Sequence, residues 1–227
     1  MARAFDAVSL DVGGVLVVPD HGTLAGALTR AGVPYDLSRF GIGHYLAMAA
    51  MDDAQSGAEV FTDYVGGFAA AVGVPAADQA TAHDALLAVL FTLVWRQPVP
   101  GSRAALSELV EAGLRLAVTS NSDGTVADHL RRHEWLQVGD GPGVPVEVIT
   151  DSGAVGVAKP DPRLFQATID GLGLPPERIL HIGDAVRYDV EGAAAVGMQS
   201  IHMDPFDVCP STDHDHVHAL AELLDLR

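Results

Sequence analysis

The sequence has few basic residues and almost no cysteine. Its 13 lysines and arginines stand against 30 aspartates and glutamates, which gives a formal net charge of -17 at pH 7. Nucleic acids and anionic membrane surfaces bind through basic patches, so this balance argues against either as the main partner. The single cysteine, Cys209, allows no intramolecular disulfide, and a reducing cytoplasm is therefore the expected location.

Long uncharged apolar runs are also missing, although 48% of the residues are hydrophobic. Asp6 and Asp11 interrupt the apolar N-terminus, so we expect no signal peptide there. No other run is long enough to span a bilayer. The 227 residues can bury a sizeable core, either as one large α/β domain or as a core with a smaller inserted domain.

Lysine is as scarce as cysteine. Twelve of the basic residues are arginines, and the only lysine is Lys159. One interpretation is that Lys159 occupies a place that needs a compact ammonium group and cannot hold a planar guanidinium. The other is an arginine-rich composition in which one lysine remains by chance.

The pattern of apolar residues predicts an α/β protein with a helical insertion. The segment FDAVSLDV is typical of a buried parallel strand. Residues 23–96 then show four stretches with helical spacing and no convincing strand, and RQPVPG closes them as a linker. We therefore predict a Rossmann-like core domain over 1–19 and 98–227, with a helical cap domain over 20–97.

The remainder of the chain alternates between helical and strand patterns, as in a doubly wound parallel sheet. Helix patterns cover 102–113, 125–136, 161–174, 189–197 and 216–227. The last of these is predicted to be an amphipathic helix that closes the chain. Strand patterns cover 114–122, 144–152, 178–184 and 198–203. Asp161 and Pro162 are placed to cap and to begin the helix over 161–174.

Polar residues follow the predicted strands where such sheets bind their ligands, at the carboxyl ends. These residues are Asp11, Ser120, Lys159, Asp184 and Asp189. Crowded carboxylates repel one another, and a hard divalent cation such as Mg²⁺ is the natural group to hold them. The Ser120 hydroxyl and the Lys159 ammonium would then donate to the oxygens of a phosphoryl group.

Four short motifs carry a resemblance to a known family. DVGGVL, TSN, VAKPDPRLF and GDAVRYD resemble, in order, the four motifs of the haloacid dehalogenase superfamily. The resemblance covers the predicted core, and the helical insertion stands where that superfamily carries its first type of cap. It implies a Mg²⁺-dependent phosphatase that acts on a small phosphorylated metabolite through an aspartyl-phosphate.

The resemblance also implies roles for individual residues. Asp11 would be the nucleophile and, with the carbonyl of Gly13, a ligand of Mg²⁺. Asp184 would be a further ligand, and Asp189 would be a ligand or would orient water bound to the metal. Ser120, Asn121 and Lys159 would bind the phosphate, with Asn121 also shaping its loop.

Gly13 departs from the pattern of this family. Typical phosphatases of the superfamily have a second aspartate there, which serves as general acid and base. Such catalysis is typically worth roughly a hundred- to ten-thousand-fold in rate. Asp20 and His21 are the first candidates to replace it, ahead of His44 in the helical insertion. The alternative is that Asp20 and His21 are solvated turn residues after Pro19.

The missing acid keeps a second function open, in which a slow or inactive relative binds a phosphorylated ligand or a partner. A metal-independent 2-haloacid dehalogenase is a third possibility, which the two acidic residues of GDAVRYD disfavour. Sugar phosphates, phosphoglycolate-like acids and nucleoside monophosphates all remain candidate substrates.

Three histidines alternate in HDHVH, at positions 214, 216 and 218. Such a cluster suggests a transition-metal site. Its period of two does not follow one face of the helix predicted to come after it, which favours a solvated loop and first helical turn.

Overall fold

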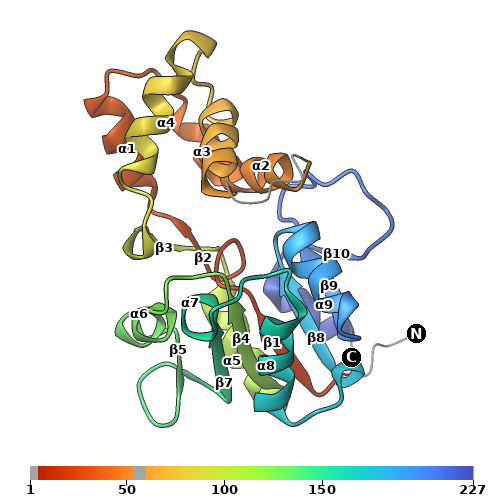
Figure 1. Cartoon of the computed structure of the whole chain (residues 1–227). Coiled ribbons are helices and arrows are strands. Elements are labelled where there is room, and N and C mark those ends of the chain that lie inside the picture. Colours follow the sequence, from red (N-terminus) through yellow and green to blue (C-terminus); the bar gives the residue numbers. More distant parts are fainter. Residues whose placement is uncertain (1–4, 54–59, 227) are drawn as a thin grey trace. The chain divides into compact units, whose positions relative to one another are not determined.

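The computed structural model describes residues 5–53 and 60–226, and the chain folds into two compact units (Figure 1). The first unit comprises Met1–Leu16, Pro98–Pro205 and Pro210–Arg227, and the second comprises Val17–Gln97 with Phe206–Cys209. Among the described residues, no helix combines the length and the apolar character needed to cross a membrane.

A six-stranded sheet with the order β10-β9-β8-β1-β4-β7 forms the centre of the first unit. All five pairs of neighbouring strands run parallel. The strands are β1 (Ala7–Leu10), β4 (Arg115–Ser120), β7 (Val148–Asp151), β8 (Ile179–Gly183), β9 (Gln199–Met203) and β10 (His216–Val217). The predicted α/β class with a parallel sheet is confirmed. From β1 the chain adds β4 and β7 on one side of the sheet, and it then adds β8, β9 and β10 on the other side of β1. Sheets of this kind bind their ligands where the strand order reverses, which here is at the carboxyl ends of β1, β4 and β8.

Helices flank this sheet (Figure 1). They are α5 (Ser102–Glu111), α6 (Val126–Arg132), α7 (Ser152–Val155), α8 (Pro162–Leu172) and α9 (Gly192–Ala195). Two short strands, β5 (Leu136–Val138) and β6 (Val144–Val146), form a separate parallel pair. The single strand predicted over 144–152 is therefore two strands, of which the second joins the main sheet.

The helix α8 shows how local sequence sets an element. The carboxylate of Asp161 accepts the backbone N–H of Arg163, and Pro162 begins the helix, as predicted. Gly173 ends the helix in the left-handed conformation, with φ of 62°. Phe165 and Ile169 then pack with Ala7 of β1 in a buried apolar cluster.

The second unit holds the four predicted helices and a strand pair that the sequence pattern did not reveal. The helices are α1 (His21–Arg30), α2 (Phe40–Asp53), α3 (Val60–Ala71) and α4 (Gln79–Leu87). The strands β2 (Val17–Pro19) and β3 (Trp95–Pro98) pair at the two ends of this insertion. Aromatic rings fill its interior, and Phe40 meets Phe68 edge to face at 5.3 Å. The predicted start of the third helix, at 58, lies outside the described residues.

Shorter helical turns complete the chain. The 3₁₀ turns cover Leu37–Arg39, Ala76–Asp78, Thr92–Val94, Pro176–Arg178 and Leu220–Leu226, and a π-helical turn covers Val186–Glu191. The predicted closing helix over 216–227 is wrong in its first turn, because His216–Val217 forms β10 and pairs with β9. The predicted helix over 189–197 is likewise split, since Val190 donates to the carbonyl of Ala185 five residues back and widens the first turn.

Candidate active site

The carboxyl ends of three neighbouring strands bring the first candidate residues together. Asp11 directly follows β1, and its N–H donates to the carbonyl of Ile182 in β8. Ser120 ends β4, and Asp184 directly follows β8. All three side chains are buried. This arrangement follows from the parallel register, which aligns the strand ends at one edge of the sheet.

Three carboxylates form the centre of this edge. Asp11, Asp184 and Asp189 each place one oxygen within 4.8 Å of the oxygens of the other two. All three residues are at least nine-tenths buried. Ionised carboxylates at this distance repel strongly where little water screens them, so the cluster needs positive charge close by.

Lys159 supplies one positive charge. Its Nζ atom lies 2.8 Å from Oδ1 of Asp11 and 2.5 Å from Oδ1 of Asp189, and its side chain is 3% exposed. The charges of Asp11 and Asp189 raise the pKa of Lys159 in spite of its burial, which alone would lower it. A single donor atom between two carboxylates suits a compact ammonium better than a planar guanidinium.

The two carboxylates that contact Lys159 have different electrostatic environments. Burial raises the pKa of Asp11 to about 7, and the neighbouring charges of Asp189 and Asp184 oppose the stabilisation that Lys159 provides. For Asp189, burial is outweighed by Lys159 and by a hydrogen bond from His181, so its pKa is lowered. Asp189 is therefore the firmly ionised member of the pair. Asp11 needs additional positive charge nearby to be ionised as readily.

Two glycines allow the carboxylates to approach the backbone. A Cβ atom on Gly14 would lie 2.0 Å from Oδ2 of Asp184, and Gly14 itself has φ of +64°. A Cβ atom on Gly183 would lie 2.1 Å from Cγ of Asp189. Both distances are far below any real contact, so the cluster can form only with glycine at these two positions.

A buried polar chain supports Asp189 from the sheet. His181 places Nε2 3.0 Å from Oδ1 of Asp189 and Nδ1 3.0 Å from Oγ of Ser9. Ser9 continues the chain to Thr119 at 2.8 Å, and Thr119 contacts Thr168 at 2.7 Å. The sequence did not predict this series of hydrogen bonds. A histidine in the middle of the apolar strand ILHIG is nevertheless a signal that a buried hydrogen-bond partner exists.

Asn121 holds the backbone of Lys159 rather than presenting a free amide. Its Oδ1 accepts the N–H of Lys159 at 2.7 Å, and its Nδ2 donates to the carbonyl of Lys159 at 3.2 Å. This pair of bonds fixes the loop that carries the ammonium. The geometry supports the loop-shaping role expected for Asn121, and its expected contact with phosphate stays a prediction.

The backbone carbonyl of Gly13 accepts the N–H of Val15 at 2.8 Å. A carbonyl oxygen has two lone pairs, so one remains for a cation. Gly13 brings no acid to the cluster.

Asp20 and His21, the predicted replacements for the missing acid, stand at the start of α1, Asp20 as its N-cap and His21 as its first residue. The Asp20 carboxylate caps α1 by accepting from the N–H and the hydroxyl of Thr23, and it pairs with Arg96. These bonds lower the pKa of Asp20, first of all the one from the Thr23 hydroxyl, so the group stays ionised. Burial lowers the pKa of His21, whose ring packs edge to face on Phe40. The acid–base role expected of Asp20 or His21 stays a prediction.

The donor set of the carboxylate cluster fits a hard divalent cation. With every group ionised, three carboxylates and one ammonium leave a net charge of -2 in a buried space. Burial, and then the charges of Asp189 and Asp184, raise the pKa of Asp11 in this space although Lys159 opposes the shift. Carboxylate and carbonyl oxygens are the ligands that Mg²⁺ and Ca²⁺ take.

A parallel α/β core, a helical insertion after its first strand and a buried carboxylate–lysine edge define a class of hydrolases. A family model for haloacid dehalogenase-like hydrolases matches residues 5–197, and the chain belongs to this family. The predicted family resemblance is confirmed.

The similar proteins include phosphatases. The chain is 36% identical over 105 residues to the phosphoserine phosphatase of Thermus thermophilus, covering 46% of this chain and 40% of that one. It is 36% identical over 135 residues to human haloacid dehalogenase-like hydrolase domain-containing protein 3, covering 56% and 51%. These matches span about half the length of the curated relatives. Among solved structures, CbbY from Rhodobacter sphaeroides in complex with phosphate has the same fold, with a TM-score of 0.56, 21% identity and 96% of each chain covered.

Proposed function

We propose that this protein is a Mg²⁺-dependent phosphatase that removes phosphate from a small phosphorylated metabolite. One observation carries the proposal: Lys159 lies between Asp11 and Asp189 at the carboxyl edge of the sheet, with Asp184 beside them. Membership of a hydrolase family and the likeness to a phosphoserine phosphatase support it.

Asp11 would act as the nucleophile. A carboxylate oxygen of Asp11 attacks phosphorus in line, the bond from phosphorus to the leaving oxygen breaks, and an aspartyl-phosphate forms. Water then attacks phosphorus, which releases phosphate and restores the carboxylate. Lys159 fixes the direction of the Asp11 carboxylate through their 2.8 Å contact and reduces the repulsion between that carboxylate and an anionic substrate.

Mg²⁺ held by Asp11, Asp184 and the carbonyl of Gly13 would supply positive charge to the phosphoryl oxygens. Asp189, kept ionised by Lys159 and His181, would complete the negative environment of the cation. The buried hydroxyl of Ser120 would donate to a phosphoryl oxygen.

The leaving oxygen receives no proton from position 13. Asp20 is held ionised by Thr23 and Arg96, which makes it a poor acid. The chemical consequence is a strong preference for esters whose leaving group is stable without a proton. A nitrophenyl ester should therefore react much faster than an alkyl ester, by at least the roughly hundred-fold that general acid catalysis contributes.

A binding protein with little turnover is the second candidate, and Gly13 is the observation that favours it. Hydrolysis of p-nitrophenyl phosphate and of a panel of phosphorylated metabolites separates the two functions. The phosphatase proposal expects Mg²⁺-dependent turnover by the wild type and none by Asp11→Asn. If the wild type is no faster than Asp11→Asn on every ester while both bind Mg²⁺, the binding function stands and the phosphatase is rejected.

A further inference from the structure

Three histidines from two segments of the first unit lie close together. His202 lies on β9, and His216 lies opposite it on β10, which pairs in parallel with β9. His214 stands two residues before His216, in the bend that leads into β10. The ring centroids of His202 lie 5.3 Å from His214 and 5.2 Å from His216, and those of His214 and His216 lie 4.5 Å apart.

In His202 and in His214, one ring nitrogen contacts an oxygen atom of a neighbouring residue, and the other ring nitrogen faces the second histidine. Nε2 of His202 lies 3.1 Å from the carbonyl oxygen of Asp184, which can only accept, so this nitrogen carries the proton. Nδ1 of His214 contacts the carboxylate of Asp213 at 2.6 Å. The remaining nitrogens, Nδ1 of His202 and Nε2 of His214, lie 3.2 Å apart.

His216 contributes a third nitrogen. Its Nε2 atom is buried and has no hydrogen-bond partner in the described structure. A buried nitrogen in this state loses its hydration without gaining a bond, which is unfavourable unless another group engages it. A metal ion that accepts its lone pair would remove this cost.

We propose that His202, His214 and His216 form a binding site for a borderline transition metal ion of the Zn²⁺ class. Their candidate ligand atoms lie within 4.8 Å of one another. A tetrahedral Zn²⁺ with bonds of about 2.1 Å places its ligands roughly 3.4 Å apart, close to the observed 3.2 Å between the nitrogens of His202 and His214. His202 contacts the carbonyl of Asp184 and His214 contacts the carboxylate of Asp213. In metalloproteins, contacts of this kind orient the imidazoles that bind the metal.

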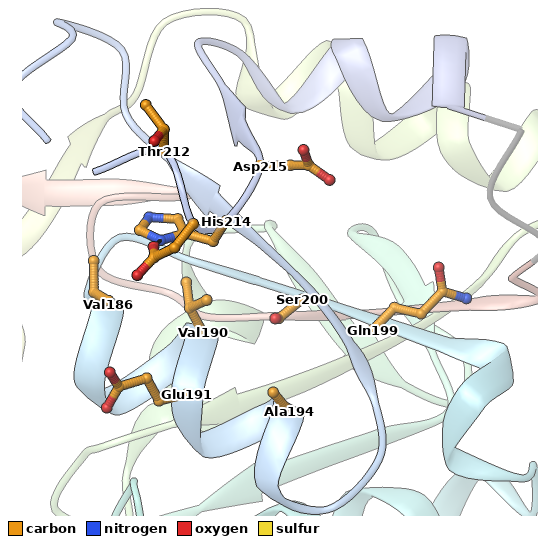
Figure 2. Close-up of a pocket in the computed structure, with 10 residues that line it drawn as sticks. Val186, Val190, Glu191, Ala194, Gln199, Ser200, Thr212, His214 and Asp215 are labelled. Atoms are coloured by element: carbon orange, nitrogen blue, oxygen red, sulfur yellow. Dashed lines mark hydrogen bonds and ion pairs between the residues drawn. The ribbon is translucent and has the colours of Figure 1, made fainter. Parts of the chain in front are cut away.

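An adjacent pocket gives an ion access to this cluster. The pocket has a volume of about 540 Å³ and lies between the turn at Val186–Glu191, α9, β9 and the segment before β10 (Figure 2). His214 lines it together with Glu191, Asp213 and Asp215. Their carboxylates raise the local concentration of cations, and the open side leaves room for water as a further ligand.

Nitrogen ligands separate this site from the carboxylate cluster. Imidazole favours Zn²⁺, Cu²⁺ and Ni²⁺, whereas carboxylates and carbonyls favour Mg²⁺ and Ca²⁺. An ion at the three histidines would join the segment before β10 to β9. Zn²⁺ should therefore raise the melting temperature of the protein, and the increase should continue as the concentration of free Zn²⁺ rises above the dissociation constant.

The test is calorimetric titration of Zn²⁺ into tag-free, chelator-stripped protein in saturating Mg²⁺, which keeps the carboxylates occupied. We expect one Zn²⁺ per chain in the wild type and a loss of affinity of roughly a hundred-fold or more in His214→Ala and His216→Ala. His218→Ala is the matched control, because it removes an exposed imidazole that pairs with Glu222 from the same segment. Circular dichroism in chelator confirms that the variants fold.

Co²⁺ provides a second measurement that does not depend on any variant. Bound by three imidazoles in a tetrahedral site, it should give intense visible absorption that Zn²⁺ abolishes and Mg²⁺ does not. The proposal is overturned if the wild type takes up no Zn²⁺ at micromolar concentrations, or if His214→Ala and His216→Ala bind it as tightly as His218→Ala. Phosphatase activity enters neither measurement, so both results are independent of the proposed function.

Discussion

The ammonium of Lys159 lies 2.8 Å from the carboxylate of Asp11, inside a site where both side chains are almost inaccessible to water. An ion pair on the surface contributes little to stability, whereas a buried one is costly to break because the partner left behind keeps its charge. The proposed nucleophile is therefore positioned by the chain's only lysine.

Replacing Lys159 tests whether a compact cation is required. Lys159→Arg should lower turnover of p-nitrophenyl phosphate by about a hundred-fold or more, because a planar fork does not fit between Asp11 and Asp189. Lys159→Met should destabilise the fold by about 3–5 kcal/mol, since it leaves buried carboxylates uncompensated. Arg163→Lys, in the exposed pair with Asp161, is the control and should change neither measurement appreciably. Equal effects at positions 159 and 163 would contradict the assigned role of Lys159.

The raised pKa of Asp11 predicts a pH-dependent stability in chelator. Burial raises this pKa to about 7, while the unfolded chain has an ordinary value near 3.9. The folded state therefore binds the proton more tightly. Ionised Asp11 destabilises the fold, an effect that is absent below about pH 4, grows as the pH rises toward 7 and is constant above it.

Asp11→Asn removes this charge. In denaturant titrations we expect the variant to gain on the order of 1–3 kcal/mol relative to the wild type between about pH 4 and pH 8. Saturating Mg²⁺ should reduce or reverse the gain, because the ionised carboxylate then has a further partner. A difference between variant and wild type that stays constant over this pH range would show that Asp11 titrates normally.

Gly14 offers a test of the approach between backbone and carboxylate. Gly14→Ala combines a left-handed φ with a collision against Asp184, and it should abolish Mg²⁺ binding measured by calorimetry. Gly32→Ala is a matched control, because Gly32 has φ of +70° and nothing within 4 Å of the added methyl group. The control should cost only about 1–2 kcal/mol for its backbone conformation and keep Mg²⁺ affinity. Unchanged Mg²⁺ binding in Gly14→Ala would exclude Asp184 as a ligand.

The bond between His181 and Ser9 is predicted to couple the sheet interior to the site. In a double-mutant cycle of His181→Phe and Ser9→Ala, chemical denaturation should give a coupling energy between about 0.5 and 3 kcal/mol. His181→Phe should also lower turnover with little change in KM, because Asp189 loses a bond that orients it. Additive free energies of unfolding would show that the two side chains act independently.

Local patterns were sufficient to predict the elements whose determinants lie within themselves. The helix α8 begins at Pro162 behind the Asp161 cap, because capping depends on neighbouring residues. Asp11 and Asp184 were expected at one edge for an equally simple reason: parallel strands align their carboxyl ends. Which ligand these residues bind stays a prediction.

Contacts between segments that lie far apart in the sequence were not predicted. His181 meets Ser9 across 172 positions of the sequence, and only the pairing of β8 with β1 brings them together. The alternation in HDHVH predicts a loop and a first helical turn, but His216 begins the strand β10 and pairs with His202 of β9. No local pattern specifies His202 as their neighbour.

The proposed mechanism transfers the phosphoryl group of the substrate to Asp11. The most direct measurement is acid quenching of the reaction with a ³²P-labelled phosphate ester, followed by mass spectrometry of the labelled peptide. We predict a Mg²⁺-dependent label on Asp11 that hydroxylamine removes, as expected of an acyl phosphate, and no label in Asp11→Asn. Hydrolysis by the wild type without a label on Asp11, or undiminished hydrolysis by Asp11→Asn, would contradict the account.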